Sequence, residues 1–151
     1  MEAIFKDRGV PALLDHAGVE AARLQRVARD ELVSSAPSVT YPMLAEARDS
    51  NVNAVRQWVN RHRNEGRIVV VTRDDNTVLI PSFQFDQMYD LDDGAAPVIA
   101  SLKEREMSDW AIWRWFYAEN AWVQRRPIDL LHEERGVDRL LELVGHIDAE
   151  A

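Results

Sequence analysis

A run of arginine and amide side chains between residues 51 and 73 is the part of this sequence best suited to recognise another molecule. Arginine pairs with guanine edges or with phosphates, and asparagine and glutamine pair with adenine edges. This combination favours double-stranded DNA as the ligand. The residues that we predict to contact DNA are Asn51, Asn53, Arg56, Gln57, Asn60, Arg61, Arg63 and Arg73.

The charge of the chain supports the same location. The 151 residues carry a formal net charge of −8, yet residues 44–73 hold six arginines against three acids. Residues 74–96 hold six aspartates and no basic residue, and residues 97–151 have a net charge of −4. A phosphate-binding surface should therefore lie mainly within residues 44–73. The acidic remainder either attracts a basic protein partner or is a solvated surface.

The sequence lacks the motifs of the common catalytic and metal sites. It has no cysteine, which removes disulfides, thiolate metal sites and cysteine nucleophiles. Its four histidines show no paired metal spacing, and there is no nucleophile elbow, P-loop or dinucleotide fingerprint. We therefore expect no catalysis, no metal and no cofactor.

Hydropathy predicts a cytoplasmic protein that binds no membrane. No apolar run approaches the roughly 20 residues of a membrane helix. Residues 1–10 lack the apolar stretch of a signal peptide. Hydrophobic residues make up 46% of the chain, which is enough to build a core.

The elements around the arginine-rich segment follow the order of a winged helix-turn-helix. We expect a short helix, a turn, a longer helix and a β-hairpin, over residues 42–48, 49–51, 52–65 and 67–80. Thr40 can cap the first helix and Gly66 can end the second. Ala45, Val55 and Trp58 have the spacing through which two such helices pack.

Two features of this motif leave its register open. Asp49 stands where helix-turn-helix motifs usually have glycine, and Arg48 and Ser50 replace the usual apolar neighbours. A small αα-β scaffold with a solvated polar face is the alternative. The aspartates at 74 and 75 argue against strong phosphate contact by the wing.

The fold class that we predict is mainly α with one small β-hairpin: a winged helix-turn-helix followed by a small Trp-rich helical domain. The four expected parts are an N-terminal helical segment, the winged helix-turn-helix, a linker and the C-terminal domain, over residues 1–36, 37–90, 91–97 and 98–151. The linker is inferred from its acid, glycine and proline content. Gly18 could divide the N-terminal helix in two.

Four of the five tryptophans fall between residues 110 and 122. Trp113, Phe116 and Tyr117 share one helical stripe, and Trp110 extends it by a turn. Such a helix is either a core element or a partner surface, and composition favours the core. Asn120 is placed to end this helix in a left-handed conformation. Pro127 can begin the next helix, with Asp129 well placed for its dipole.

Residues 108–147 resemble the toxin-binding domain of the Xre/MbcA/ParS-type antitoxins. The family pattern is a Trp-containing helix, an Asn, a Pro-x-(Asp/Glu)-Leu-Leu segment and a Leu/Val-rich helix that ends near a Gly. The matching residues here are Trp113 and Trp115, Asn120, Pro127–Leu131 and Val137–Gly145.

The resemblance implies an antitoxin that blocks a RES-domain, NAD-consuming toxin and represses its own operon. In relatives the C-terminal end reaches toward the cleft of the toxin. The residues mapped as toxin contacts are Trp113, Arg125, Arg126, His146, Asp148 and Glu150. Fraying is the alternative for the tail. A homodimer on operator DNA is expected because dimers read two half-sites.

The second hypothesis is a stand-alone DNA-binding repressor with no toxin partner, for example a prophage immunity repressor. It keeps the same DNA-reading helix and uses the C-terminal domain for dimerisation or for more DNA contact. The net charge of that domain counts against the DNA contact. A scaffold that binds neither partner is the third. A neighbouring gene for a RES protein would favour the antitoxin, and an isolated gene in a phage context would favour the repressor.

Overall fold

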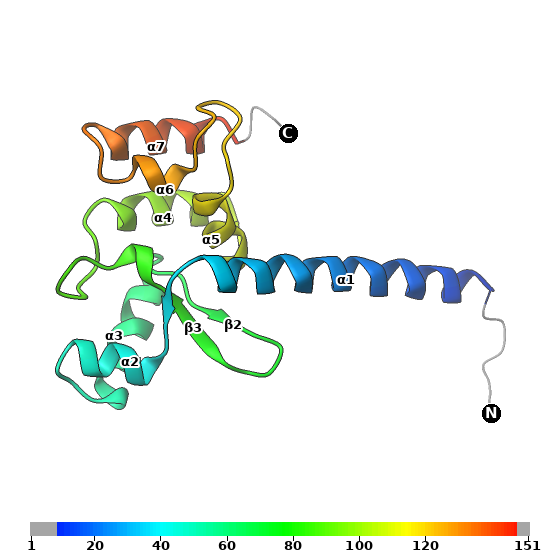
Figure 1. The fold of residues 1–151 in the computed structure, drawn as a ribbon, viewed down its shortest axis with the longest axis horizontal. Helices are drawn as coiled ribbons and strands as arrows, with labels where there is room; N and C mark the ends of the chain where they lie inside the picture. The colour runs from blue at the N-terminus through cyan, green and yellow to red at the C-terminus, as the bar shows by residue number, and fades with distance from the viewer. Residues whose placement is uncertain (1–8, 148–151) are drawn as a thin grey trace. The chain divides into compact units, whose positions relative to one another are not determined.

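The computed structural model describes residues 9–147. They fall into two units, and the division along the chain lies between Ser35 and Ala36. The first unit consists of α1 (Gly9–Ser35), coloured blue in Figure 1. The helix is continuous, so Gly18 does not divide it. No helix within residues 9–147 is long and apolar enough to cross a membrane.

The second unit, called the main unit below, holds the predicted helix-turn-helix, the hairpin and the C-terminal helices. Its first elements are β1 (Ser38–Val39), α2 (Tyr41–Ala47), α3 (Val52–Asn64), β2 (Val71–Thr72) and β3 (Val78–Pro81). Those that follow are the 3-10 turn η1 (Ser82–Gln84), α4 (Ala95–Glu104), α5 (Asp109–Tyr117), α6 (Pro127–Leu130) and α7 (Gly136–Gly145). The described chain is mainly helical with one small sheet, which confirms the predicted fold class.

The sheet is antiparallel, with strand order β1-β3-β2. The β2–β3 hairpin was predicted, but β1 was not. β1 has only two residues and pairs Val39 with Ile80 of β3. Two residues are too few for an alternating pattern to show in the sequence.

The predicted packing of α2 on α3 is confirmed. Ala45 and Val55 are buried, together with Leu44 and Val59, and Trp58 is half-buried against the same cluster. Thr40 caps α2, because its Oγ1 accepts from the Met43 amide at 3.3 Å.

Residues 91–97 do not form an extended linker. The Asp92 carboxylate is buried and accepts hydrogen bonds from the amides of Gly94 and Ala95, at 3.0 and 2.9 Å. α4 begins at Ala95, within the expected linker, and the described residues from Ala36 to Ile147 belong to one unit. The acidic and small residues that suggested a linker serve here to start a helix.

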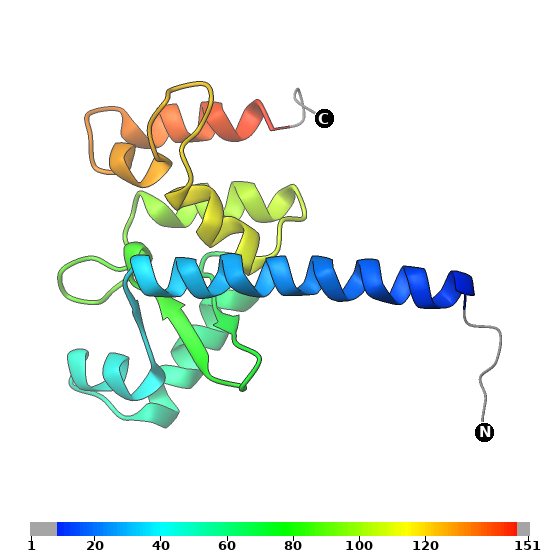
Figure 2. The ribbon, with the colours of Figure 1, turned by 45° about the vertical axis from the view of Figure 1, so that its right-hand side comes forward.

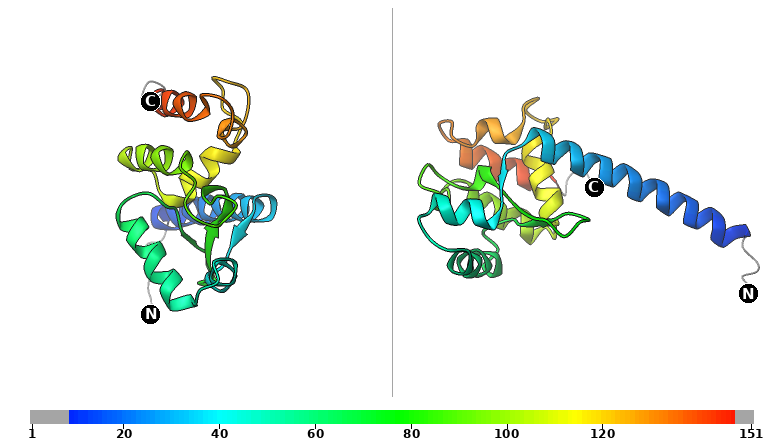
Figure 3. Two further views of the ribbon diagram at one scale, coloured as in Figure 1. Left: turned by 90° about the vertical axis from the view of Figure 1, so that its left-hand side faces the viewer. Right: turned by 60° about the horizontal axis from the view of Figure 1, so that its bottom comes forward.

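The C-terminal helices pack closely on one another. α4 lies against α7 and α5, and α6 contacts both α5 and α7, as Figure 2 shows. η1 joins this core to the sheet, because the Phe83 and Phe116 rings lie 4.3 Å apart between centroids. A Cβ at Gly136 would lie 1.9 Å from the Leu130 carbonyl oxygen, so only glycine fits where α7 passes α6. In the left view of Figure 3, the α2–α3 pair and the α6–α7 pair lie at opposite ends of the main unit.

The end of α5 differs from the expectation. The residue that ends α5 is Ala118, and Asn120 does not have a positive φ. Asn120 starts a tight loop instead: its Oδ1 accepts from the Trp122 amide at 2.8 Å, and Gln124 takes the left-handed conformation with φ 56°. Pro127 and Asp129 do lie in the first turn of α6, as predicted.

Candidate nucleic-acid interface

The two ends of α3 are fixed by local hydrogen bonds. Asn51 caps the helix, because its Oδ1 accepts from the Ala54 amide at 2.9 Å. At the other end Gly66 has φ 72°, the left-handed conformation that ends helices. The amides of Gly66 and Arg67 donate to Arg63 and His62, both at 3.0 Å, which satisfies the last carbonyls. α3 is therefore a rigid element on which exposed side chains can be held.

The outer face of α3 carries most of the predicted DNA contacts. Val55 and Val59 point into the core, and helical spacing turns the polar positions away from it. The exposed members of the predicted set are Asn51, Asn53, Arg56, Gln57, Asn60, Arg61 and Arg63. Arg73 lies apart from them at the end of β2 and is half-buried.

The α2–α3 turn explains how Asp49 replaces glycine. Asp49 has φ 54°, and the amide of Ser50 donates to the Ala45 carbonyl at 2.8 Å. Aspartate is one of the few residues with a side chain that adopt this conformation at modest cost. The turn therefore forms with aspartate in place of glycine.

Arg48 has a structural role that the sequence did not reveal. Its guanidinium lies 3.8 Å from the centre of the Trp58 ring, and its Nη1 donates to the Tyr89 carbonyl at 2.6 Å and to Asp90 at 2.8 Å. Arg48 thus connects the turn, α3 and the loop of residues 86–90. Only the unusual charged residue in place of an apolar one could have signalled it.

A groove of about 610 Å³ runs between α3 and the tip of the hairpin. Arg56 and Asn60 line it from α3, and Asn76 and Thr77 line it from the hairpin. The Arg56 guanidinium lies 4.9 Å from the centre of the Tyr41 ring, an attraction that holds the charge at this edge of α3. The groove lies along the edge of α3 that carries Arg56.

The hairpin tip is acidic and internally bonded. The amide of Thr77 donates to Asp75 Oδ1 at 3.0 Å, and hydrogen bonds from Thr77 hold the pKa of Asp75 below its ordinary value. Asp74 and Asp75 are both exposed. This local charge is consistent with the expectation that the tip does not bind phosphate strongly.

Arg63 differs from the other arginines of α3. Its Nε lies 3.8 Å from Asp109 Oδ2, and Lys103 contacts the other oxygen of the same carboxylate at 3.1 Å. Asp109 also accepts a hydrogen bond from the Val70 amide at 2.9 Å. The charge of Arg63 is therefore partly compensated within the main unit.

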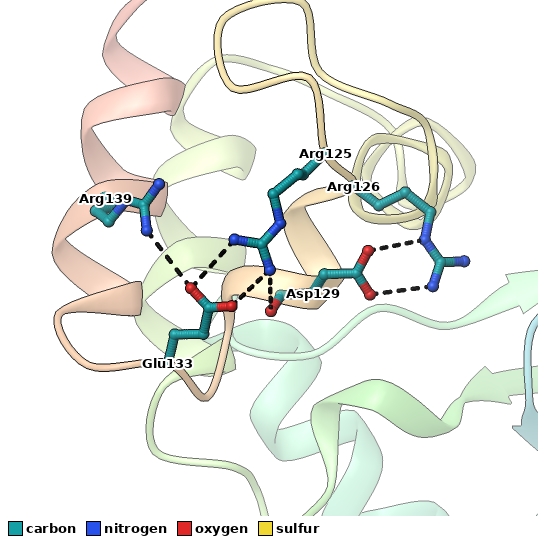
Figure 4. Close-up of polar contacts among 5 residues, drawn as sticks. All are labelled: Arg125, Arg126, Asp129, Glu133 and Arg139. Atoms are coloured by element: carbon teal, nitrogen blue, oxygen red, sulfur yellow. Dashed lines mark hydrogen bonds and ion pairs between the residues drawn. The ribbon is translucent and has the colours of Figure 1, made fainter.

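The arginines predicted to bind a toxin are exposed but paired, as Figure 4 shows. Arg126 donates to Asp129 through two nitrogens, at 3.2 and 3.1 Å. Arg125 contacts Glu133 at 2.5 Å, and Arg139 lies 3.5 Å from the same carboxylate. The hydrogen bonds of Arg125 and Arg126 lower the pKa of Glu133 and of Asp129 and raise the pKa of Arg125 and of Arg126.

The other residues predicted to bind a toxin have different surroundings. Trp113 is fully buried, so it is a core residue and not a contact that a partner can reach. His146 is half-buried and stacks on Trp122 at 4.2 Å between ring centres. Asp148 and Glu150 lie outside the described residues. Trp122, which the prediction omitted, is 54% exposed.

Neither surface contains an evident metal site. Among the described residues, no group of three or more histidine, aspartate or glutamate side chains is arranged to hold a metal ion. The closest polar pair of this kind is His132 and Asp92, whose Nε2 and Oδ1 lie 2.9 Å apart. That carboxylate is the cap of α4, which accounts for its position.

Element order, turn geometry and exposed helix face together define a winged helix-turn-helix arrangement. The fold is similar to that of a solved structure, described as the NMR structure of Rv2175c, with a TM-score of 0.56 and 22% sequence identity. The similarity covers 78% of this chain and 82% of that one. No family model matches the chain, and no curated protein matches it significantly. The comparisons therefore support the fold and give no support to the resemblance to Xre/MbcA/ParS-type antitoxins.

Proposed function

We propose that this protein is a DNA-binding regulator that inserts α3 into the major groove of double-stranded DNA. The observation that carries the proposal is the outer face of α3, where amide and arginine side chains are exposed on a helix with fixed ends. An α-helix fits the width of the major groove. The role proposed is binding, without catalysis.

The charges of this face suit the DNA backbone. By helical spacing, Arg56 and Arg61 lie on opposite edges of the face, with Gln57 and Asn60 between them. A helix in the major groove has phosphates on both sides, so each edge arginine can approach one strand.

Fluorescence anisotropy with a labelled mixed-sequence duplex tests the proposal. We expect binding that weakens as salt rises, with a slope of roughly 0.9 per phosphate contact. Arg56→Ala and Arg61→Ala should each reduce that slope. Arg114→Ala is the matched control, because it removes an exposed arginine from α5. Absence of binding at low salt, or equal loss in the control, would contradict the proposal.

The antitoxin function is a second candidate, and it rests on the resemblance of residues 108–147. The observation that favours it is the Trp122–His146 stack, an exposed aromatic anchor of the kind that protein interfaces use. Co-expression with a RES-domain toxin encoded nearby tests it by growth and pull-down. Deletion of residues 146–151 should impair neutralisation and leave DNA binding intact. If no complex forms, the stand-alone repressor remains.

We expect self-association for both the antitoxin and the stand-alone repressor, because a dimer reads two half-sites. Sedimentation at several concentrations, with and without duplex DNA, measures it. We expect two copies of the chain on one operator duplex. One copy per duplex at saturation would contradict a dimeric regulator.

A further inference from the structure

The centre of the α3 outer face is lined by amides. Asn53, Gln57 and Asn60 are four and three residues apart, so they form one stripe along the helix. All three are exposed, and the stripe lies opposite Val55 and Val59. The centre of a recognition helix is the part that reaches base edges, so these amides are best placed to read sequence.

The three amides are available for a ligand. Within residues 9–147, none of their side chains makes a hydrogen bond or ion pair with another described residue. Asn51 contrasts with them, because its side-chain oxygen is occupied as the cap of α3. The stripe is therefore not explained by the stability of the helix.

The arginines of α3 are displaced from this stripe. Arg56 is held at one edge over the Tyr41 ring, and Arg63 is drawn toward Asp109. Arg61 lies on the opposite edge by helical spacing. The guanidinium groups are thus placed for phosphates, and the central positions that reach base edges hold only carboxamides.

We infer that α3 reads adenine bases in the major groove, through Asn53, Gln57 and Asn60. A carboxamide matches adenine because its oxygen accepts from N6 and its nitrogen donates to N7. The inference deepens the proposed function and rests on it. Seven residues separate Asn53 from Asn60, which is about 10 Å of helix, or about three base pairs. The expected element is a half-site of about three base pairs rich in A·T.

The test begins with selection of duplexes from a random pool by the full-length chain. The selected half-site is then made with 7-deazaadenine, which keeps Watson–Crick pairing and lacks the N7 acceptor. We expect binding to weaken by about fivefold or more at the contacted adenines. The matched duplex with 7-deazaguanine at its guanines should bind as before.

Two variants locate the effect on the stripe. Gln57→Arg should change the preferred base at one position from adenine to guanine, because arginine pairs with guanine O6 and N7. Gln25→Leu on α1 is the matched control, since it removes an exposed amide from outside the main unit. Thermal unfolding of both variants shows that each still folds.

The outcomes separate this inference from the function beneath it. Binding to duplex DNA without an effect of 7-deazaadenine overturns adenine reading and leaves DNA binding standing. A selected half-site rich in G·C, or sensitivity to 7-deazaguanine alone, does the same. No binding to any duplex overturns both proposals.

Discussion

Two groups of arginines were predicted to contact partners, and their surroundings differ. Arg56 and Arg61 lie on a helix face whose other side chains are amides, and Arg56 is held by an aromatic ring. Arg126 pairs with Asp129 in α6, and Arg125 pairs with Glu133, which follows α6. The guanidinium groups of Arg56 and Arg61 have no acid beside them on α3. Those of Arg125 and Arg126 donate hydrogen bonds to nearby carboxylates. Exposed arginines in this chain therefore differ in whether an acid already pairs with them.

The largest expected effect concerns the C-terminal helices. Trp113→Ala should lower the free energy of unfolding by about 3–5 kcal/mol, because it leaves a cavity in the core. Trp122→Ala at the exposed stack should cost far less. Urea unfolding of both variants measures this. A loss below about 1 kcal/mol for Trp113→Ala would contradict the assignment of Trp113 to the core.

The next effect compares the two groups of arginines directly. Arg56→Ala should weaken binding to the selected DNA and reduce the salt slope by about 1, as expected for the loss of one phosphate contact. Arg126→Ala should leave that affinity unchanged, because its guanidinium already pairs with Asp129. Titration of both variants against one duplex measures the difference. Equal losses of affinity would show that pairing with a carboxylate does not decide which arginines contact DNA.

Arg48 lies in the helix-turn-helix, but it pairs with an acid as the second group does. Arg48→Met keeps much of the contact with Trp58 and removes the hydrogen bonds to Tyr89 and Asp90. We expect a loss of about 1–2 kcal/mol in unfolding free energy. Trp58 fluorescence should shift as its neighbour changes. An unaltered stability would mean that the loop of residues 86–90 is held by other contacts.

Asp49→Gly gives a smaller effect of opposite sign. The left-handed conformation costs a residue with a side chain on the order of 1 kcal/mol, and glycine removes that strain. Greater freedom of the unfolded chain offsets part of the gain. A net stabilisation below about 1 kcal/mol is expected by thermal unfolding, with DNA affinity unchanged. Marked destabilisation would show that the Asp49 side chain is itself required.

The smallest effect is on pH dependence. Arg125 holds the pKa of Glu133 below its ordinary value, and Arg126 does the same for Asp129. The stability from these pairs is present above the ordinary carboxyl pKa and is lost as pH falls through the lowered values. NMR titration should show the Glu133 pKa rising in Arg125→Ala. An unchanged Glu133 titration would show that Arg125 does not lower the pKa of this carboxyl group.

The sequence predicted well those features that neighbouring residues determine. Thr40 caps α2, Gly66 ends α3, and Pro127 begins α6. Each needs only a few residues of context, because a cap bonds amides two or three positions away. The exposed face of α3 follows from its spacing in the same way.

Features that depend on distant residues were missed or misplaced. Asp92 was expected in a linker, but its carboxylate caps α4 and lies beside His132, which is 40 positions away. Arg48 meets Asp90, 42 positions away. Glu133 pairs with Arg125, eight positions away on the other side of α6. Surroundings of this kind arise only when the chain is folded.

The two amides that precede β2 are bonded to side chains instead of to a neighbouring strand. Val69 donates to Gln84, and Val70 donates to Asp109 at the start of α5. An amide exchanges its hydrogen with solvent only when its bond opens. Deuterium uptake at the Val70 amide would therefore report the separation of α5 from the base of the hairpin. Uptake at the Val69 amide would report the separation of η1 from it. Hydrogen exchange at two adjacent residues therefore reports on the opening of two different contacts in the main unit.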